Sequence, residues 1–208
     1  MSYSLKKEQA YDRRYGKALS PAIRGYINMI IQCTKELLKI MKREPEPIPD
    51  GEPVNPLYIW NATLYRMGRN RMMVLQNSMM RCVIILFRPM AKDFAALDDR
   101  LSEAIRLLFA EMKIPEERIE KYLAKAGKCI LTKSGSRKEI GRLVQVCKDL
   151  EYGPITEEQF RKNALYQTEI SMWCCEGILW QTEDKRVVSA IDSTREAIEL
   201  VTKMELDT

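Results

Sequence analysis

The chain has 208 residues and a formal net charge of +5, and it combines 46% hydrophobic residues with no histidine. That hydrophobic content is enough to build a core at this length, which excludes a disordered chain. Without histidine, the usual general base near neutral pH, the usual metal ligand and every Ser/His or Cys/His pair are missing. Catalysis by carboxylates or lysine, and a Mg²⁺ site bound by carboxylates, remain possible without histidine. Most hydrolase mechanisms do not.

The charge is distributed unevenly along the chain. Residues 1–148 carry 28 Lys and Arg against 16 Asp and Glu, whereas residues 149–208 carry 6 against 13. A body of +12 is thus joined to a tail of −7, and segregated charge of this kind acts on partners rather than on the fold. Two stretches, 57–92 and 121–138, each contain six basic residues and no acid.

Targeting signals and cysteine usage point to one compartment. No apolar run approaches the ~20 residues needed to cross a bilayer, and residues 1–16 are too polar for a secretory signal. The six cysteines lie in apolar segments, without the spacing of a zinc site or a disulfide framework. We therefore expect a cytoplasmic protein with buried, reduced thiols and no membrane segment.

The first part of the chain predicts an arm, a strand, a helix and a loop. Residues 1–25 form a basic arm. Residues 27–33 are an apolar run typical of a buried strand, and Thr34 is placed to cap a helix over 35–42. Five prolines and an Asp-Gly pair then predict a stiff, extended loop.

The middle of the chain predicts a small sheet followed by helices. Residues 58–87 contain three runs of strand-forming residues separated by the turn signals Gly68-Arg69-Asn70 and Asn77-Ser78, which predicts a three-stranded antiparallel meander. Residues 92–112 place apolar side chains three or four apart, as on one face of a helix. A second helix is predicted from Pro115 to Gly127.

The last part predicts one more strand and three helices. Residues 129–132 are expected to form a short inner strand. The Ser134-Gly135-Ser136 loop then leads into a helix that ends at Gly153-Pro154. Two further helices are predicted over 156–179 and 187–204.

Together these elements predict an α+β fold. We expect a small, mostly antiparallel sheet covered by helices on one side, with a helical C-terminal extension. The domain organisation expected is a basic arm over 1–25, an α+β core domain over 26–153 and an acidic helical extension over 154–208.

Three segments, taken together, resemble a known family. They are Ile31-Gln32-Cys33-Thr34-Lys35-Glu36-Leu37-Leu38, Trp60-Asn61-Ala62-Thr63-Leu64, and Leu131-Thr132-Lys133-Ser134-Gly135-Ser136-Arg137 with Ile140-Gly141. In order and spacing, over about residues 28–152, they are similar to an uncharacterised bacterial family, domain of unknown function number 6933. The resemblance implies a compact α+β domain of bacterial or phage-borne origin and carries over no activity. Its members tend to have a polar ring or an amide pair in the Trp-x-Ala-x-Leu stretch, where this chain has Asn61 and Thr63 and hence no titrating group.

Basic residues form two candidate sites for phosphate. Arg66, Arg69 and Arg71 crowd a predicted hairpin tip, where each guanidinium offers a planar fork of donors. The alternative is a solubilising turn that prevents edge pairing. Residues 133–138 lie between a strand and a helix N-terminus, a geometry suited to anions, although Ser136 as a simple helix cap also explains them. The predicted nucleic-acid-binding residues are Arg66, Arg69, Arg71, Arg81, Lys133, Ser136, Arg137 and Lys138.

Three other groups have structural explanations. Methionines are dense around the predicted meander, and core packing explains them better than a contact surface. They are Met29, Met67, Met72, Met73, Met79 and Met80. The pair Cys174-Cys175 indicates burial rather than redox chemistry, because no nearby run of cations would lower a thiol pKa. Asp98, Asp99 and Glu103 are the one carboxylate cluster that suits Mg²⁺, but nearby arginines indicate ion pairs instead.

The sequence therefore predicts a non-enzymatic accessory or binding protein, without cofactor or metal, whose basic surface engages nucleic acid or a ribonucleoprotein. The alternative is a protein-interaction module that docks through its Met-rich face and its acidic C-terminal helices. A carboxylate and Mg²⁺ dependent nuclease ranks third.

Overall fold

The computed structural model describes residues 27–48, 55–134, 136–181 and 185–203. Within these residues the chain forms seven α-helices, a five-stranded sheet and a two-stranded sheet, so the predicted α+β class is confirmed. The predicted N-terminal arm, residues 1–25, lies outside the described part of the chain. None of the described helices has the length and apolar character needed to cross a membrane.

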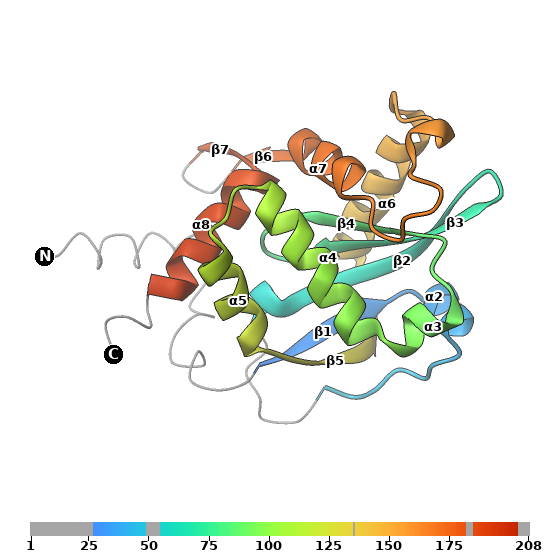
Figure 1. Ribbon diagram of the computed structural model, residues 1–208, viewed down its shortest axis with the longest axis horizontal. Coiled ribbons are helices and arrows are strands. Elements are labelled where there is room, and N and C mark those ends of the chain that lie inside the picture. Colours follow the sequence, from blue (N-terminus) through green and yellow to red (C-terminus); the bar gives the residue numbers. More distant parts are fainter. Residues whose placement is uncertain (1–26, 49–54, 135, 182–184, 204–208) are drawn as a thin grey trace, which may run out of the picture.

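The five-stranded sheet has the order β4-β3-β2-β1-β5 and forms the centre of the molecule (Figure 1). Its strands are β1 (Ile27–Cys33), β2 (Ile59–Met67), β3 (Asn70–Asn77), β4 (Val83–Phe87) and β5 (Ala126–Lys133). The meander β2-β3-β4 is antiparallel, as predicted. However, β1 pairs in parallel with both β2 and β5. The sheet is therefore mixed, and the expectation of a mostly antiparallel sheet was wrong.

The error has a physical cause. The residue pattern of a strand identifies the strand but not its partner. Parallel strands need a long connection, usually with a helix, and such connections precede β2 and β5. For the same reason β5 was wrongly expected to be an inner strand. It lies at an edge of the sheet, where the backbone N–H of Glu46 donates to the carbonyl of Leu131 at 2.6 Å.

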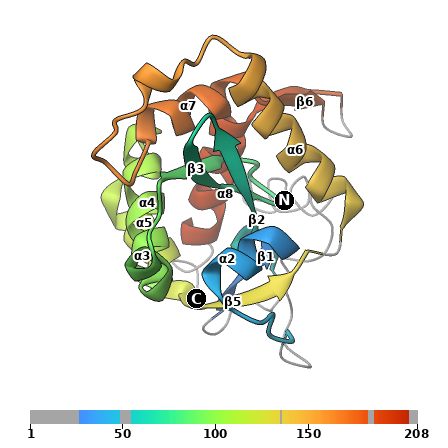
Figure 2. The ribbon, with the colours of Figure 1, turned by 90° about the vertical axis from the view of Figure 1, so that its right-hand side faces the viewer.

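Helices cover both faces of the sheet, not one as expected. Figure 2 shows the sheet between α4 and α5 on one side and α6 on the other. All of β4 and all of β3 except Arg71 are buried, and such uninterrupted burial arises when both faces are packed. The helices are α2 (Lys35–Met41), α3 (Ala91–Ala95), α4 (Leu97–Glu111), α5 (Glu116–Lys125), α6 (Arg137–Tyr152), α7 (Thr168–Gly177) and α8 (Ala190–Lys203).

Two predicted helices begin later than expected. The stretch over 156–179 is helical in α form only from Thr168, because the buried Gln167 side chain accepts the N–H of Arg161 and donates to the carbonyls of Arg161 and Ala164. These bonds hold the preceding segment as a loop. The stretch over 187–204 starts as β7 (Val187–Ser189), which pairs with β6 (Leu179–Gln181), and only then becomes α8.

One continuous core joins early and late parts of the chain. It contains strand residues such as Ile31 and Val74 together with Ile170 of α7 and Ile198 of α8. The predicted burial of the methionines is confirmed for all but Met67, which is half-buried at the edge of the core. These methionines therefore fill the interior, as flexible side chains do.

The outer edge of β4 is closed by α7 and by the segment that leads into it. Cys175 Sγ accepts the N–H of Val83 at 3.2 Å, and Ser171 Oγ accepts the N–H of Ile85 at 3.1 Å. The N–H of Phe87 donates to the carbonyl of Leu165 at 2.7 Å. An open strand edge invites pairing with other chains, so these bonds protect the sheet.

We predict that Ser171→Ala lowers the free energy of unfolding by about 1–3 kcal/mol, because the buried N–H of Ile85 loses its acceptor. Urea unfolding followed by circular dichroism measures the change. Ser102→Ala, on a partly exposed side of α4, serves as the control and should stay within about 0.5 kcal/mol of the parent. Equal effects of the two substitutions would show that the β4 edge does not depend on this serine.

Candidate functional site

The eight predicted nucleic-acid-binding residues fall into three separate places. Arg66, Arg69 and Arg71 lie at the tip of the β2–β3 hairpin, and all three are exposed. Arg81 lies in the β3–β4 turn, at the other end of β3, which spans 8 residues or about 26 Å. Lys133, Ser136, Arg137 and Lys138 lie at the junction of β5 and α6.

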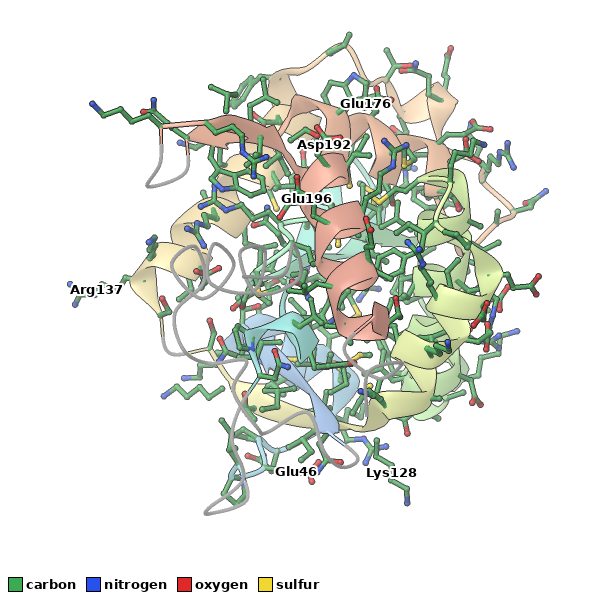
Figure 3. All side chains as sticks on the ribbon, turned by 90° about the vertical axis from the view of Figure 1, so that its left-hand side faces the viewer. Glu46, Lys128, Arg137, Glu176, Asp192 and Glu196 are labelled. Carbon is green, nitrogen blue, oxygen red and sulfur yellow. The ribbon has the colours of Figure 1, made fainter. Side chains whose placement is uncertain are left out.

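The hairpin tip and the β5–α6 junction also lie apart, at opposite ends of α6. Tyr65, beside the tip, belongs to β2, which packs against α6. Burial, together with Glu151 and Cys147 near the end of α6, raises the pKa of Tyr65 to about 12. Arg137 is the first residue of α6, which has 16 residues and is thus about 24 Å long. Figure 3 shows Arg137 projecting outward from one side of the molecule.

The tip of the hairpin is a two-stranded ribbon that extends past the rest of the sheet. Pairing between β1 and β2 ends at Ala62, and pairing between β3 and β4 starts at Met72, so residues 66–71 continue as β2 and β3 alone. We call residues 66–71 the β2–β3 ribbon, and Figure 1 shows this end of the hairpin projecting to the right. Arg66 lies directly opposite Arg71 across the ribbon, and Gly68 adopts the positive φ of +57° that the turn requires.

Side chains from other elements contact the ribbon at and beside its turn. Arg88 Nε donates to Asn70 Oδ1 at 2.6 Å, and Asn70 Nδ2 donates to Glu157. Arg66 lies 3.6 Å from Glu36 of α2, an exposed pair that contributes little to stability. The acids of α8 face elsewhere, since Figure 3 shows Asp192 and Glu196 along one side of the helix. Each of them pairs with an arginine of its own C-terminal segment.

Two of the other predicted positions, Arg81 and Ser136, have structural roles. The guanidinium of Arg81 lies 4.1 Å from the ring centre of Trp180, a cation–π contact that joins the β3–β4 turn to β6. Ser136 Oγ accepts the N–H of Glu139 at 3.3 Å, so its predicted cap on α6 is confirmed. Lys133 and Arg137 are exposed beside it.

The carboxylates near α4 form hydrogen bonds and ion pairs, as the sequence indicated. Asp98 Oδ1 accepts the N–H of Cys129 at 2.8 Å, and Arg106 binds both Glu103 at 2.8 Å and Glu120 at 2.7 Å. These bonds engage Asp98 and Glu103, two of the three carboxylates of the cluster. In the described ranges, no group of three or more cysteine or carboxylate side chains is placed to hold a metal ion.

A row of polar side chains, which the sequence did not reveal, crosses four strands of the sheet. Gln76 of β3 is opposite Asn61 of β2, Asn61 is beside Gln32 of β1, and Gln32 is beside Thr132 of β5. We call these four residues the polar row. Tyr65 of β2 lies next to α6, and Asn61 is four residues before Tyr65. Strand residues at even spacing share a face. The polar row therefore lies on the α6 side of the sheet.

A second polar group continues the row toward the carboxyl ends of the parallel strands. Thr34 follows β1 and Thr63 is two residues beyond Asn61, and their hydroxyl oxygens are 3.2 Å apart. Ser134, two residues beyond Thr132, donates its N–H to the carbonyl of Cys33 at 3.0 Å. All three of these residues are half-buried.

The three segments on which the family resemblance rests therefore meet on three adjacent parallel strands. The model of one family, a domain of unknown function (DUF6933), matches residues 30–193. The chain belongs to this family. The match continues past residue 153 and includes α7, consistent with the continuous core. No curated protein and no solved structure matches the chain.

The surroundings of the cysteines in this DUF6933 domain disfavour the thiolate form. Burial raises the pKa of Cys33 and Cys175 to about 12 each, and burial together with Glu151 does the same for Cys147. Cys174 lines a pocket of about 470 Å³ between α6 and α7, but burial raises its pKa as well. A raised pKa keeps a thiol protonated, and the thiolate is the reactive form.

We therefore predict that the native protein resists thiol modification at pH 8. A disulfide reagent such as DTNB should react slowly with the folded chain and rapidly with all six cysteines in denaturant. Absorbance of the released thiolate measures both rates. Rapid reaction of Cys174 or Cys175 in the folded protein would contradict the structural role assigned to them.

The polar row generates a stability prediction. Thr132 is buried, and its hydroxyl has no hydrogen-bond partner in the described part of the chain. Thr132→Val should raise the free energy of unfolding by about 1 kcal/mol, because it removes an unpaired buried polar atom and keeps the shape. Thr194→Val, which removes a buried hydroxyl bonded to the carbonyl of Ala190, should lower it by a similar amount. Urea unfolding compares them, and two equal losses would show that Thr132 has a partner.

Proposed function

We propose that this protein is a non-enzymatic binding protein whose β2–β3 ribbon contacts the phosphates of a nucleic acid. The observation that carries the proposal is the placement of Arg66 directly opposite Arg71, with Arg69 exposed at the turn between them. Like charges directly opposite each other on paired strands are destabilising. The exposed pair of Arg66 with Glu36 gives the fold little in return, whereas a bound polyanion would neutralise the arginines.

The shape of the ribbon supports the same proposal. It is two strands wide, extends beyond its neighbours, and presents arginines from both strands. A two-stranded ribbon fits the major groove of duplex DNA. Guanidinium groups bind phosphate oxygens in a bidentate manner. The lack of histidine in the sequence favours binding over catalysis, because the side chain best suited to proton transfer near neutral pH is missing.

The alternative of a protein-interaction module is less well supported. It requires an exposed methionine surface, but five of the six methionines named for it are buried in the core. It also requires C-terminal helices that stand apart, whereas α7 and α8 contribute Ile170, Cys175 and Ile198 to the interior. The ribbon needs no such rearrangement to reach a partner.

Two matched variants test the proposal. The ribbon variant replaces Arg66, Arg69 and Arg71 by Gln, and the junction variant replaces Lys133, Arg137 and Lys138 by Gln. Both remove three positive charges, so a difference between them reports position rather than net charge. Fluorescence anisotropy with labelled duplex DNA and single-stranded RNA, titrated over a range of salt concentrations, measures the affinities.

We expect the ribbon variant to bind more weakly than the junction variant at low salt. For duplex DNA, the slope of log K against log salt should become shallower by about 2.7, since each lost phosphate contact removes about 0.9. Equal losses in the two variants would show a general electrostatic attraction without a site. A parent protein without affinity at low salt, or with affinity indifferent to salt, would overturn the proposal.

A further inference from the structure

We infer that the polar row binds a neutral, planar hydrogen-bonding group, such as a carboxamide or a nucleobase. The row consists of Gln32, Asn61, Gln76 and Thr132, and three of these side chains are at least nine-tenths buried, with 2% of Asn61, 4% of Gln76 and 6% of Thr132 exposed. Such burial of polar groups is costly unless hydrogen bonds compensate it. The bonds within the described part of the chain leave that compensation incomplete.

The incomplete bonding is specific to two members of the row. Asn61 Nδ2 donates to Ser78 Oγ at 2.9 Å, while Asn61 Oδ1 is buried without a partner among the described residues. Turning the amide over would not change this, because Ser78 offers one hydroxyl and Asn61 has two polar groups. The hydroxyl of Thr132, at the other end of the row, is also buried without a partner among the described residues.

The neighbouring amide is already oriented. Gln76 Nε2 donates to the carbonyl of Arg81 at 3.3 Å, which directs its donor toward the β3–β4 turn. Gln32 lies between Asn61 and Thr132 in register and is partly exposed. The row therefore has buried members at both ends and a partly exposed member, Gln32, between Asn61 and Thr132. Preorganised polar groups of this kind set the orientation of a ligand.

The chemistry of the row defines the class of ligand. Its members are amides and a hydroxyl, which carry no charge and can both donate and accept. A neutral group with neighbouring N–H and carbonyl positions satisfies such side chains, in the way that Asn and Gln read the edges of bases. Gln32 and Thr132 of the row lie next to the carboxyl ends of β1 and β5, and α/β sheets bind ligands at that edge of parallel strands.

Side-chain amide resonances in a ¹H–¹⁵N spectrum of the full chain test the inference. The probes are uridine, adenosine, acetamide and glutamine, each titrated to millimolar concentration. We expect saturable shifts of the Asn61, Gln32 and Gln76 amides with at least one probe. Shifts with the nucleosides alone would identify a base as the ligand group. Shifts with the two carboxamides alone would identify an amide. The absence of a saturable shift with any probe would overturn the inference.

Variants give the second arm of the test. Thr132→Val and Asn61→Leu should each weaken binding roughly tenfold, as expected for the loss of one good hydrogen bond. Gln145→Leu, on the exposed side of α6, is the matched control and should leave binding unchanged. Thr132→Val keeps the shape of the side chain, so it remains informative if Asn61→Leu folds poorly. Undiminished binding by folded Thr132→Val would contradict its place in the site.

This inference is independent of the proposed function. The probes are uncharged, so their binding should not vary with salt, and the ribbon variant should bind them as the parent does. Failure of phosphate binding at the ribbon would leave the amide shifts in place. Failure of the probes would leave the salt-dependent affinity in place.

Discussion

The parallel pairing of β1 with both β2 and β5 is the constraint on which the rest of the structure depends. It joins three segments that lie far apart in the chain, and the antiparallel meander extends from one side of this unit. The register is fixed by burial, because a slip by one residue would turn Ile31 and Cys33 to the opposite face. The same register aligns Gln32 with Asn61 and Thr132. The packing of the sheet and the polar row therefore both follow from this register.

Features with local causes could be read from the sequence. The meander follows from alternating residues and turn signals, and α6 begins where Ser136 caps it. Features with distant causes could not. The partners of β1, the edge position of β5, and the loop held by Gln167 all depend on contacts that no local pattern contains. In the sequence, only the uninterrupted apolar run of β4 indicated that helices cover both faces of the sheet.

The candidate sites divide in the same way. Exposure of Arg66, Arg69 and Arg71 followed from their place at a turn, but their separation from Lys133 and Arg137 is a property of the fold. The polar row gave no signal of its own, since a single glutamine in an apolar strand is unremarkable until its neighbours are known. The one hint was that Gln32, Asn61 and Thr132 each fall within a segment that carries the family resemblance.

The closure of β4 by Ser171 and Cys175 bears on how the protein is made. The serine lies 86 residues after Ile85, the strand residue whose N–H it accepts. At ~5–20 residues per second, a ribosome needs about 4–17 s to add that stretch. During this interval the β4 edge of the nascent sheet lacks the helix that covers it. A chaperone that shields this edge would matter more than for a protein whose sheet is completed locally.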